Sequence, residues 1–127
     1  MDKWLFYLAT PYSHDDPEVR EERFHMACDV AGHLMGKGIY VYSPIAHTHP
    51  LACRCDLPKG FEFWEGYDRL ILSKCNALLV VMADGWAESK GVNAEILMAR
   101  QMGIVVYEMW YPEYRKWVAT FLEDLEP

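Results

Sequence analysis

At 127 residues the chain is long enough to bury one core and too short for two independent ones, so we predict a single domain over residues 1–127. Its 12 Lys and Arg against 19 Asp and Glu give a net charge of -7, which disfavours a nucleic-acid polymer and favours a small-molecule ligand. No stretch reaches the roughly 20 apolar residues of a membrane span, and no secretory signal follows Met1. We therefore expect a soluble, cytoplasmic protein without a membrane partner.

The first half of the chain shows two short apolar segments separated by a helical pattern. A strand is predicted over residues 4–8, and a helix begins after Asp16 as N-cap with Pro17 at its first position. Glycines close this helix before a second strand over residues 39–42. An irregular loop rich in Pro and Cys is expected over residues 47–60.

The second half continues the alternation of strands and helices. Helices are predicted over residues 61–75, 92–102 and 114–122, and strands over 77–82 and 104–107. Such alternation is typical of a parallel sheet. We predict an α/β fold with a flavodoxin-like, doubly wound parallel sheet of four to five strands and helices on both faces.

In folds of this class, ligands bind beyond the carboxyl ends of the strands, where the strand order reverses. Four segments meet this condition: residues 9–14, 43–49, 83–91 and 108–111. Each carries aromatic or hydrogen-bonding residues, and a crevice of mixed polar and aromatic character suits a base joined to a sugar. Loops are polar in most proteins, so this pattern is weak by itself.

A carboxylate interrupts the apolar stripe of the helix predicted over residues 92–102. Glu95 follows Val92 by three residues and precedes Ala99 by four, so it shares the face that packs on the sheet. A carboxylate there costs free energy unless it is hydrogen-bonded or useful. Glu95 is the first candidate for chemistry, and an ion pair with Arg100 is the structural alternative.

A second acid, Asp68, lies among the aromatic and aliphatic residues of the helix predicted over residues 61–75. Its structural alternative is a partly solvated helix acid, or an ion pair with Arg69 or Lys74. Two acids that face one pocket suit substitution at an anomeric carbon, where the transition state is oxocarbenium-like. One acid attacks the sugar and the other manages a proton.

Histidines and cysteines gather in the segment after the second strand. His47, His49, Cys53 and Cys55 are residue types that bind zinc, but their spacing matches none of the usual structural sites. We expect no metal and no cofactor, and a zinc-binding loop is an alternative. His47 follows the end of a predicted strand. The sequence favours equally a contact to a ligand and a role in ordering the loop.

Two motifs resemble the nucleoside 2-deoxyribosyltransferase superfamily, including its nucleoside-monophosphate N-glycosidase branch and small uncharacterised relatives. Residues 6–13, FYLATPYS, look like the family's first strand and substrate loop. Residues 84–91, DGWAESKG, with Glu95 four residues later, resemble its acid/Ser/Gly stretch and catalytic glutamate. The similarity in the order of elements spans roughly residues 4 to 110.

The resemblance implies a role for each matching residue. Glu95 corresponds to the nucleophile, Tyr7 to the tyrosine that orients it, and Asp68 to an acid that assists proton transfer. Ser89 and the segment around Thr10 correspond to sugar or 5′-phosphate contacts, and Glu88 to an acid near the base. Trp86 is a candidate for stacking on the base, with plain packing as its alternative. The substrate-binding candidates are Thr10, Tyr12, Ser13, His47, Trp86, Glu88, Ser89 and Gly91.

The activity that the resemblance implies is cleavage of the N-glycosidic bond of a nucleoside or nucleoside 5′-monophosphate through a covalent glycosyl-Glu95 intermediate. Water then gives hydrolysis, and a second base gives transfer. Because transferase members complete their pocket with a neighbouring subunit, we expect a homodimer or homotetramer. The rival function is a non-catalytic sensor module that binds a nucleotide without cleaving it.

Overall fold

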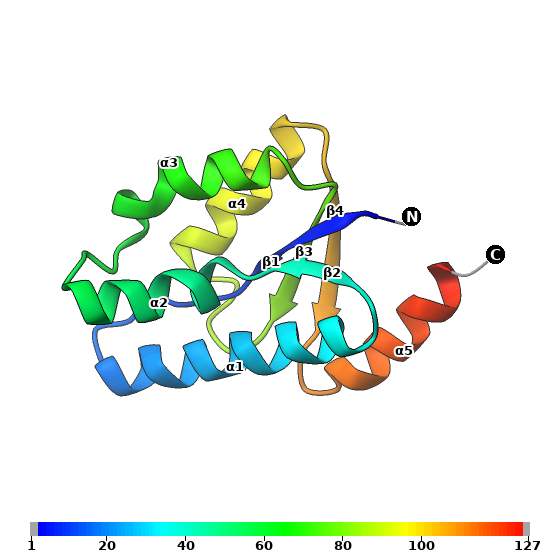
Figure 1. Cartoon of the computed structure of the whole chain (residues 1–127), viewed down its shortest axis with the longest axis horizontal. Coiled ribbons are helices and arrows are strands. Elements are labelled where there is room, and N and C mark those ends of the chain that lie inside the picture. Colours follow the sequence, from blue (N-terminus) through cyan, green and yellow to red (C-terminus); the bar gives the residue numbers. More distant parts are fainter. Residues whose placement is uncertain (1–2, 126–127) are drawn as a thin grey trace.

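The computed structural model describes residues 3–125 and confirms the predicted α/β fold with a parallel sheet. Four strands lie in the order β2-β1-β3-β4, and every neighbouring pair is parallel, as in a flavodoxin-like fold (Figure 1). In chain order the elements are β1 (Leu5–Ala9), α1 (Pro17–Gly36), β2 (Tyr40–Tyr42), α2 (Pro44–Cys55), α3 (Phe61–Leu72), β3 (Ala77–Met82), α4 (Lys90–Gln101), β4 (Val105–Trp110) and α5 (Tyr114–Leu125).

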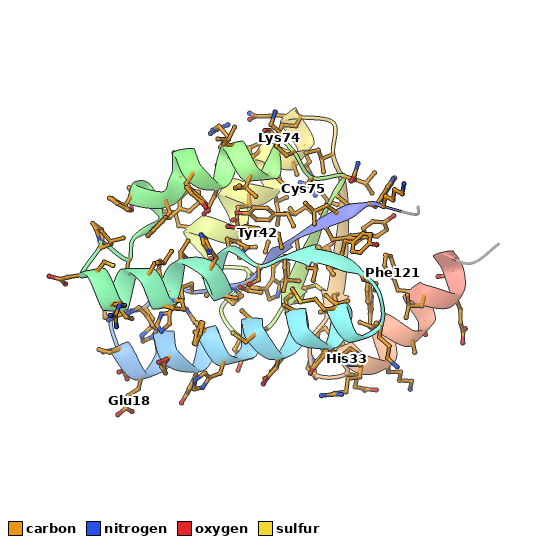
Figure 2. All side chains as sticks on the ribbon, viewed as in Figure 1. Glu18, His33, Tyr42, Lys74, Cys75 and Phe121 are labelled. Atoms are coloured by element: carbon orange, nitrogen blue, oxygen red, sulfur yellow. The ribbon has the colours of Figure 1, made fainter. Side chains whose placement is uncertain are left out.

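Helices cover both faces of the sheet, as the alternation of elements predicts. Alternate side chains of β1 point to opposite faces, so Phe6 and Leu8 enter the core under α1 and α5. Tyr7 and Ala9 enter the other core, which α3 and α4 close. Figure 2 shows the two layers, with Phe121 on the α5 side. The sheet is therefore doubly wound, and β1 carries residues of both cores.

The strand order reverses between β1 and β3. The chain passes from β1 to β2 on one side and from β3 to β4 on the other, so the two connections diverge at the carboxyl ends of these central strands. Such a divergence leaves room for a ligand in open α/β sheets. The segment after β1 and the start of α4 border this place.

The prediction of an irregular loop over residues 47–60 is wrong, because most of this segment is helix α2. Ser43 caps the helix by accepting a hydrogen bond from the Ala46 backbone N–H at 3.2 Å, and Pro44 occupies the first turn. Pro50 has no backbone N–H and so removes one helical hydrogen bond, and it lies on the solvent-exposed side of α2. The opposite face, with Thr48 and Ala52, is buried and packs on α1 and β1. This burial offsets the cost of the proline.

Several other element boundaries differ from the sequence prediction by one to three residues. Helix α3 ends at Leu72 rather than at residue 75. Strand β4 continues to Trp110, because Met109 and Trp110 stay paired with the end of β3. Most of the predicted loop over residues 108–111 is therefore strand, and it does not join the crevice.

Two further features of the described residues are the state of the cysteines and the character of the helices. All four cysteines are free; Cys75 is buried, Cys28 is half-buried, and Cys53 and Cys55 are exposed. Across residues 3–125 no helix combines the length and the apolar character needed to cross a membrane.

Candidate functional site

A pocket lies beyond the carboxyl end of β1, where α2, α3 and the start of α4 approach one another. The space that water-sized groups can occupy in it is about 40 Å³, and about 490 Å³ is free of protein atoms when the open mouth is included. Seven residues proposed from the sequence line it: Thr10, Tyr12, Ser13, Asp68, Ser89, Gly91 and Glu95. The pocket therefore gathers residues from three separate segments of the chain.

Glu95 lies in the second turn of α4, and its side chain turns inward to the pocket. The residue is only 5% exposed. Tyr7, the third residue of β1, donates a hydrogen bond from its hydroxyl to Glu95 Oε2. Within the described part of the chain Glu95 forms no ion pair, so the alternative pairing with Arg100 is not seen.

Burial governs the ionisation of Glu95. Loss of solvent raises the pKa of this carboxyl to about 8, the hydrogen bond from Tyr7 opposes the rise, and the charge of Asp68 adds to it. Burial and the two nearby carboxyls also raise the pKa of Tyr7 far above its usual value. Tyr7 therefore stays a neutral phenol and can only donate to Glu95 through its proton.

Asp68 lies on the inner face of α3 and is 6% exposed. Burial alone raises its pKa to about 7. Its Oδ1 has no hydrogen-bond partner among the described residues, and no ion pair with Arg69 or Lys74 is present among them. An unpaired buried oxygen typically costs about 1–3 kcal/mol, so a ligand that bonds to it gains accordingly.

The two carboxyls act as a coupled pair. The charge of Asp68 raises the cost of ionising Glu95, and their pKa values of about 8 for Glu95 and about 7 for Asp68 are close. Each group is therefore partly protonated near neutral pH, and the free-energy difference between the two singly protonated forms is small. Such a pair supplies one carboxylate and one carboxylic acid to the same pocket.

Polar groups beside the acids offer contacts to a ligand. Thr10 Oγ1 is buried and has no partner among the described residues. Ser89 caps α4 by accepting a hydrogen bond from the Val92 backbone N–H at 3.1 Å. A Cβ on Gly91 would stand 3.3 Å from Phe61 Cδ1, so the glycine lets the Phe61 ring close this end of the pocket.

Three substrate-binding candidates do not line the pocket. His47 lies on the exposed side of α2, where its ring stacks on Tyr67 and its Nε2 is 3.2 Å from the Tyr67 hydroxyl. Trp86 packs against the core under α3 and α4, which agrees with the packing role given above as its alternative. Glu88 is exposed to solvent. The formation of α2 explains the position of His47, because residues two apart on a helix, such as His47 and His49, point to nearly opposite sides.

Seven lining residues were not proposed as ligand contacts from the sequence. They are Ile45, Thr48, His49, Ala52, Lys59, Phe61 and Trp64. Four of them belong to α2, and the Ser43-Pro44 pair is the sequence signal that could have revealed this helix. Helix α2 also separates His47 from His49, and residues 3–125 contain no group of three or more side chains placed to bind a metal.

Comparison with known proteins supplies a family. Residues 5–110 match the family model described as Domain of unknown function (DUF1937). No curated protein matches the chain. The matched span runs from β1 through β4 and includes every residue that lines the pocket.

Proposed function

We propose that this chain, which belongs to the family described as Domain of unknown function (DUF1937), cleaves the N-glycosidic bond of a nucleoside or nucleoside 5′-monophosphate. One observation carries the proposal: a buried carboxylate, Glu95, receives a hydrogen bond from Tyr7 and shares its pocket with a second buried acid, Asp68. The resemblance of residues 6–13 and 84–91 to nucleoside 2-deoxyribosyltransferases supports the choice of bond.

In the first step Glu95 attacks the anomeric carbon C1′ of the sugar. A bond forms between a carboxylate oxygen and C1′ while the bond from C1′ to the base nitrogen breaks, with its electron pair on the base. Asp68 gives its proton to the departing base. The hydrogen bond from Tyr7 favours the carboxylate form of Glu95, which makes the attack, and holds one of its oxygens in place.

In the second step the glycosyl ester on Glu95 is resolved. A water oxygen or the nitrogen of a second base attacks C1′, and the electron pair of the ester bond returns to the Glu95 carboxylate. Asp68, now ionised, takes the proton that the attacking group loses. The same two acids thus serve hydrolysis and transfer, and the second molecule admitted to the pocket selects between them.

The lining suits a ligand with an aromatic and a polar part. Phe61 and Trp64 from α3 supply rings on which a base can stack. Thr10, Ser13 and Ser89 supply hydroxyls for the sugar or a 5′-phosphate, and Lys59 supplies the cation. This division of contacts fits a nucleoside better than a purely apolar ligand.

We also propose that the chain assembles as a homodimer or homotetramer. Trp110 is 54% exposed on the outer edge of the sheet, and Phe63 and Leu70 on α3 are exposed as well. Exposed aromatic residues beside an unpaired strand edge favour association. Sedimentation velocity at micromolar concentration tests this proposal, and a monomer there would contradict it.

The activity is tested with adenosine, guanosine, cytidine and uridine, with their 2′-deoxy forms and thymidine, and with the 5′-monophosphates of all of these. Each is incubated with the wild-type protein, with and without a free second base, and chromatography follows base release. Intact mass spectrometry after rapid acid quenching detects a sugar on the protein, and a peptide map locates it. The expected result is base release together with a glycosyl group on Glu95.

The assay separates the rival functions. Base release without an added base indicates hydrolysis, and release only with a second base indicates transfer. Binding by calorimetry without release from any member of the panel would replace the proposal with the non-catalytic sensor.

A further inference from the structure

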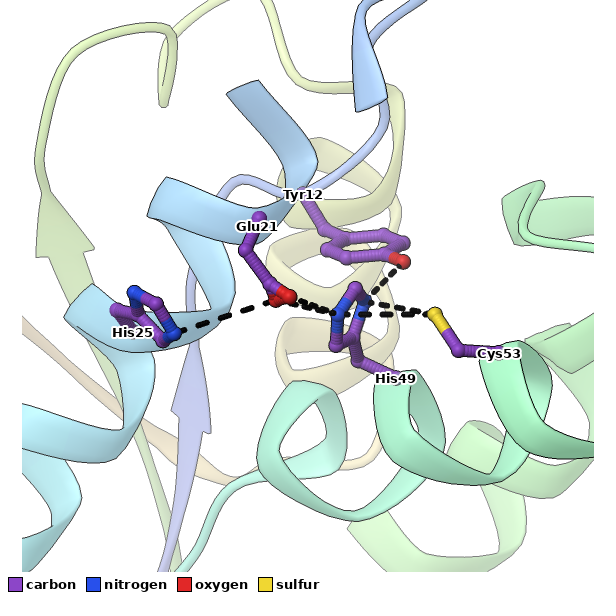
Figure 3. A network of polar contacts seen from close by, with 5 residues as sticks. All are labelled: Tyr12, Glu21, His25, His49 and Cys53. Atoms are coloured by element: carbon purple, nitrogen blue, oxygen red, sulfur yellow. Dashed lines mark hydrogen bonds and ion pairs between the residues drawn. The ribbon is translucent and has the colours of Figure 1, made fainter. Parts of the chain in front are cut away.

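A chain of three polar side chains runs from the pocket to the protein surface. The Tyr12 hydroxyl is 2.6 Å from His49 Nδ1, and His49 Nε2 is 3.1 Å from Glu21 Oε2 (Figure 3). Tyr12 and His49 line the pocket and are buried, whereas the Glu21 side chain is 48% exposed. The proposed reaction uses none of these three side chains.

The surroundings of His49 fix the orientation of its ring. Phe24 stacks on it with 4.4 Å between the ring centroids, and Tyr12 meets it edge-on at 5.4 Å. The Cys53 sulfur lies 3.7 Å from Nε2 on the remaining side. Because these contacts come from α1, α2 and the segment after β1, the ring is held from three elements.

The carboxylate at the outer end determines the direction of every hydrogen bond in the chain. An ionised Glu21 only accepts, so His49 Nε2 donates to it. In a neutral ring the other nitrogen, Nδ1, then carries a lone pair and accepts from the Tyr12 hydroxyl. The proton of Tyr12 is therefore directed to His49, so its oxygen can only accept a hydrogen bond from a ligand.

We propose that Tyr12 is a specificity-determining residue that accepts a hydrogen bond from a sugar hydroxyl of the substrate. This inference rests on the proposed function for the kind of ligand, because the reacting sugar must lie near Glu95. Tyr12 follows β1, which also carries Tyr7, the hydrogen-bond partner of Glu95. The rings suited to the base come from α3, so the wall formed by Tyr12 faces the sugar.

The polarised chain strengthens this acceptor. Each hydrogen bond points toward Glu21, so electron density shifts toward the Tyr12 oxygen and makes it a better acceptor. Burial raises the pKa of Tyr12 to about 12, with contributions from Cys53 and Glu21 and an opposing one from Arg20. Tyr12 thus remains a hydroxyl group at neutral pH. His25 also approaches Glu21, at 4.0 Å, from the exposed side of α1.

Two measurements test the proposal. The first is the nitrogen-15 NMR spectrum of the His49 ring at about pH 8, where histidine rings are ordinarily neutral. The expected tautomer carries its proton on Nε2, and this measurement needs no substrate. A ring protonated on Nδ1 would overturn the proposal, because Tyr12 would then be free to donate.

The second measurement compares ligands with and without each hydroxyl. Adenosine, guanosine, cytidine and uridine are each tested beside their 2′-, 3′- and 5′-deoxy analogues, in binding to the Glu95→Gln variant and in turnover by the otherwise wild-type protein. Loss of one hydroxyl should weaken binding or kcat/KM about tenfold or more, because the Tyr12 oxygen is left unpaired. In Tyr12→Phe this ratio should fall to about one.

The control and the outcomes separate this inference from the proposed function. His25→Gln removes a neighbour of Glu21 outside the chain and should keep the wild-type ratio. A Tyr12→Phe variant that weakens all ligands equally, or keeps the ratio, would show a purely structural tyrosine and overturn the inference. Hydroxyl-dependent binding that needs Tyr12, without base release, would uphold the inference and reject the glycosidase. A protein that binds no member of the panel would reject both.

Discussion

Tyr7 and Glu95 lie 88 residues apart in the sequence, and the Tyr7 hydroxyl donates a hydrogen bond to the Glu95 carboxylate inside the protein. Tyr7 belongs to a central strand, and Glu95 belongs to the helix that covers the next strand. The bond joins the two elements where the strand order reverses. It also opposes the rise in the pKa of Glu95 that burial causes. The hydrogen bond therefore both positions the Glu95 carboxylate and favours its ionised form.

Replacement of Glu95 by Gln should abolish base release while the protein stays folded. Gln keeps the shape and accepts the hydrogen bond from Tyr7, but it cannot form the glycosyl ester. The rate should fall by a factor on the order of 1,000 or more, as for other catalytic nucleophiles. Chromatographic assay and circular dichroism measure the two properties.

Glu88→Gln is the matched control for this substitution. Glu88 is exposed and does not line the pocket, so its variant should keep the wild-type rate. Full activity in a folded Glu95→Gln protein would remove Glu95 from the mechanism.

Stability should fall as the pH rises above the ordinary range of carboxyl ionisation. The folded-state pKa values of about 8 for Glu95 and about 7 for Asp68 exceed the values of an unfolded chain. The folded state therefore binds more protons, and this stabilisation is complete below about pH 4 and is lost as the pH rises through about 8. Denaturant unfolding at a series of pH values measures the effect.

The double variant Glu95→Gln, Asp68→Asn isolates the contribution of these two groups. It removes both ionisations, so its free energy of unfolding should decline less between about pH 5 and 9 than that of the wild type. Over this range the wild type should lose a few kcal/mol more of its free energy of unfolding than the double variant loses. Parallel slopes would mean that neither carboxyl has a raised pKa in the folded protein.

Tyr7→Phe should shift the pH dependence of the reaction. Removing the hydroxyl removes the interaction that lowers the pKa of Glu95, so this pKa rises further. The ascending limb of kcat/KM against pH, which requires an ionised nucleophile, should move to higher pH, and the rate near pH 7 should fall about tenfold or more. An unshifted limb would show that the Tyr7 hydrogen bond does not govern this ionisation.

Asp68→Asn should remove the opposite, descending limb of the pH profile. The wild-type profile should be bell-shaped, because one member of the pair must be ionised while the other holds a proton. Asn has no proton to give, so substrates with poor leaving bases should slow most. A wild-type rate with every base would return Asp68 to a structural role.

Ser89→Ala should lower the free energy of unfolding, and this effect does not depend on which substrate the protein uses. The Ser89 side chain caps α4 through the Val92 N–H, and loss of an N-cap costs about 1 kcal/mol. Ser13→Ala provides the comparison, because Ser13 also lines the pocket but caps no helix. Equal free energies of unfolding for the two variants would contradict the capping role.

Much of the fold could be predicted from local patterns. The short apolar runs and the helical spacing around them indicated all four strands and four of the five helices. Helix α2 was missed because Pro50 and the cysteines suggested a loop, although Ser43 and Pro44 form a regular helix start. A local pattern does not reveal that one face of α2 is buried against α1 and β1, which offsets the cost of an internal proline.

The sequence by itself determined the parallel α/β architecture and singled out Glu95 and Asp68, because periodicity reports which face of an element is buried and a carboxyl on such a face stands out. Only the tertiary structure decided that Tyr7 bonds to Glu95, that His49 rather than His47 lines the pocket, and that Tyr12 is linked to Glu21 at the surface. These contacts join residues from distant segments. Their geometry depends on how strands and helices pack, and hydrogen bonds form only where that packing brings a donor and an acceptor within reach.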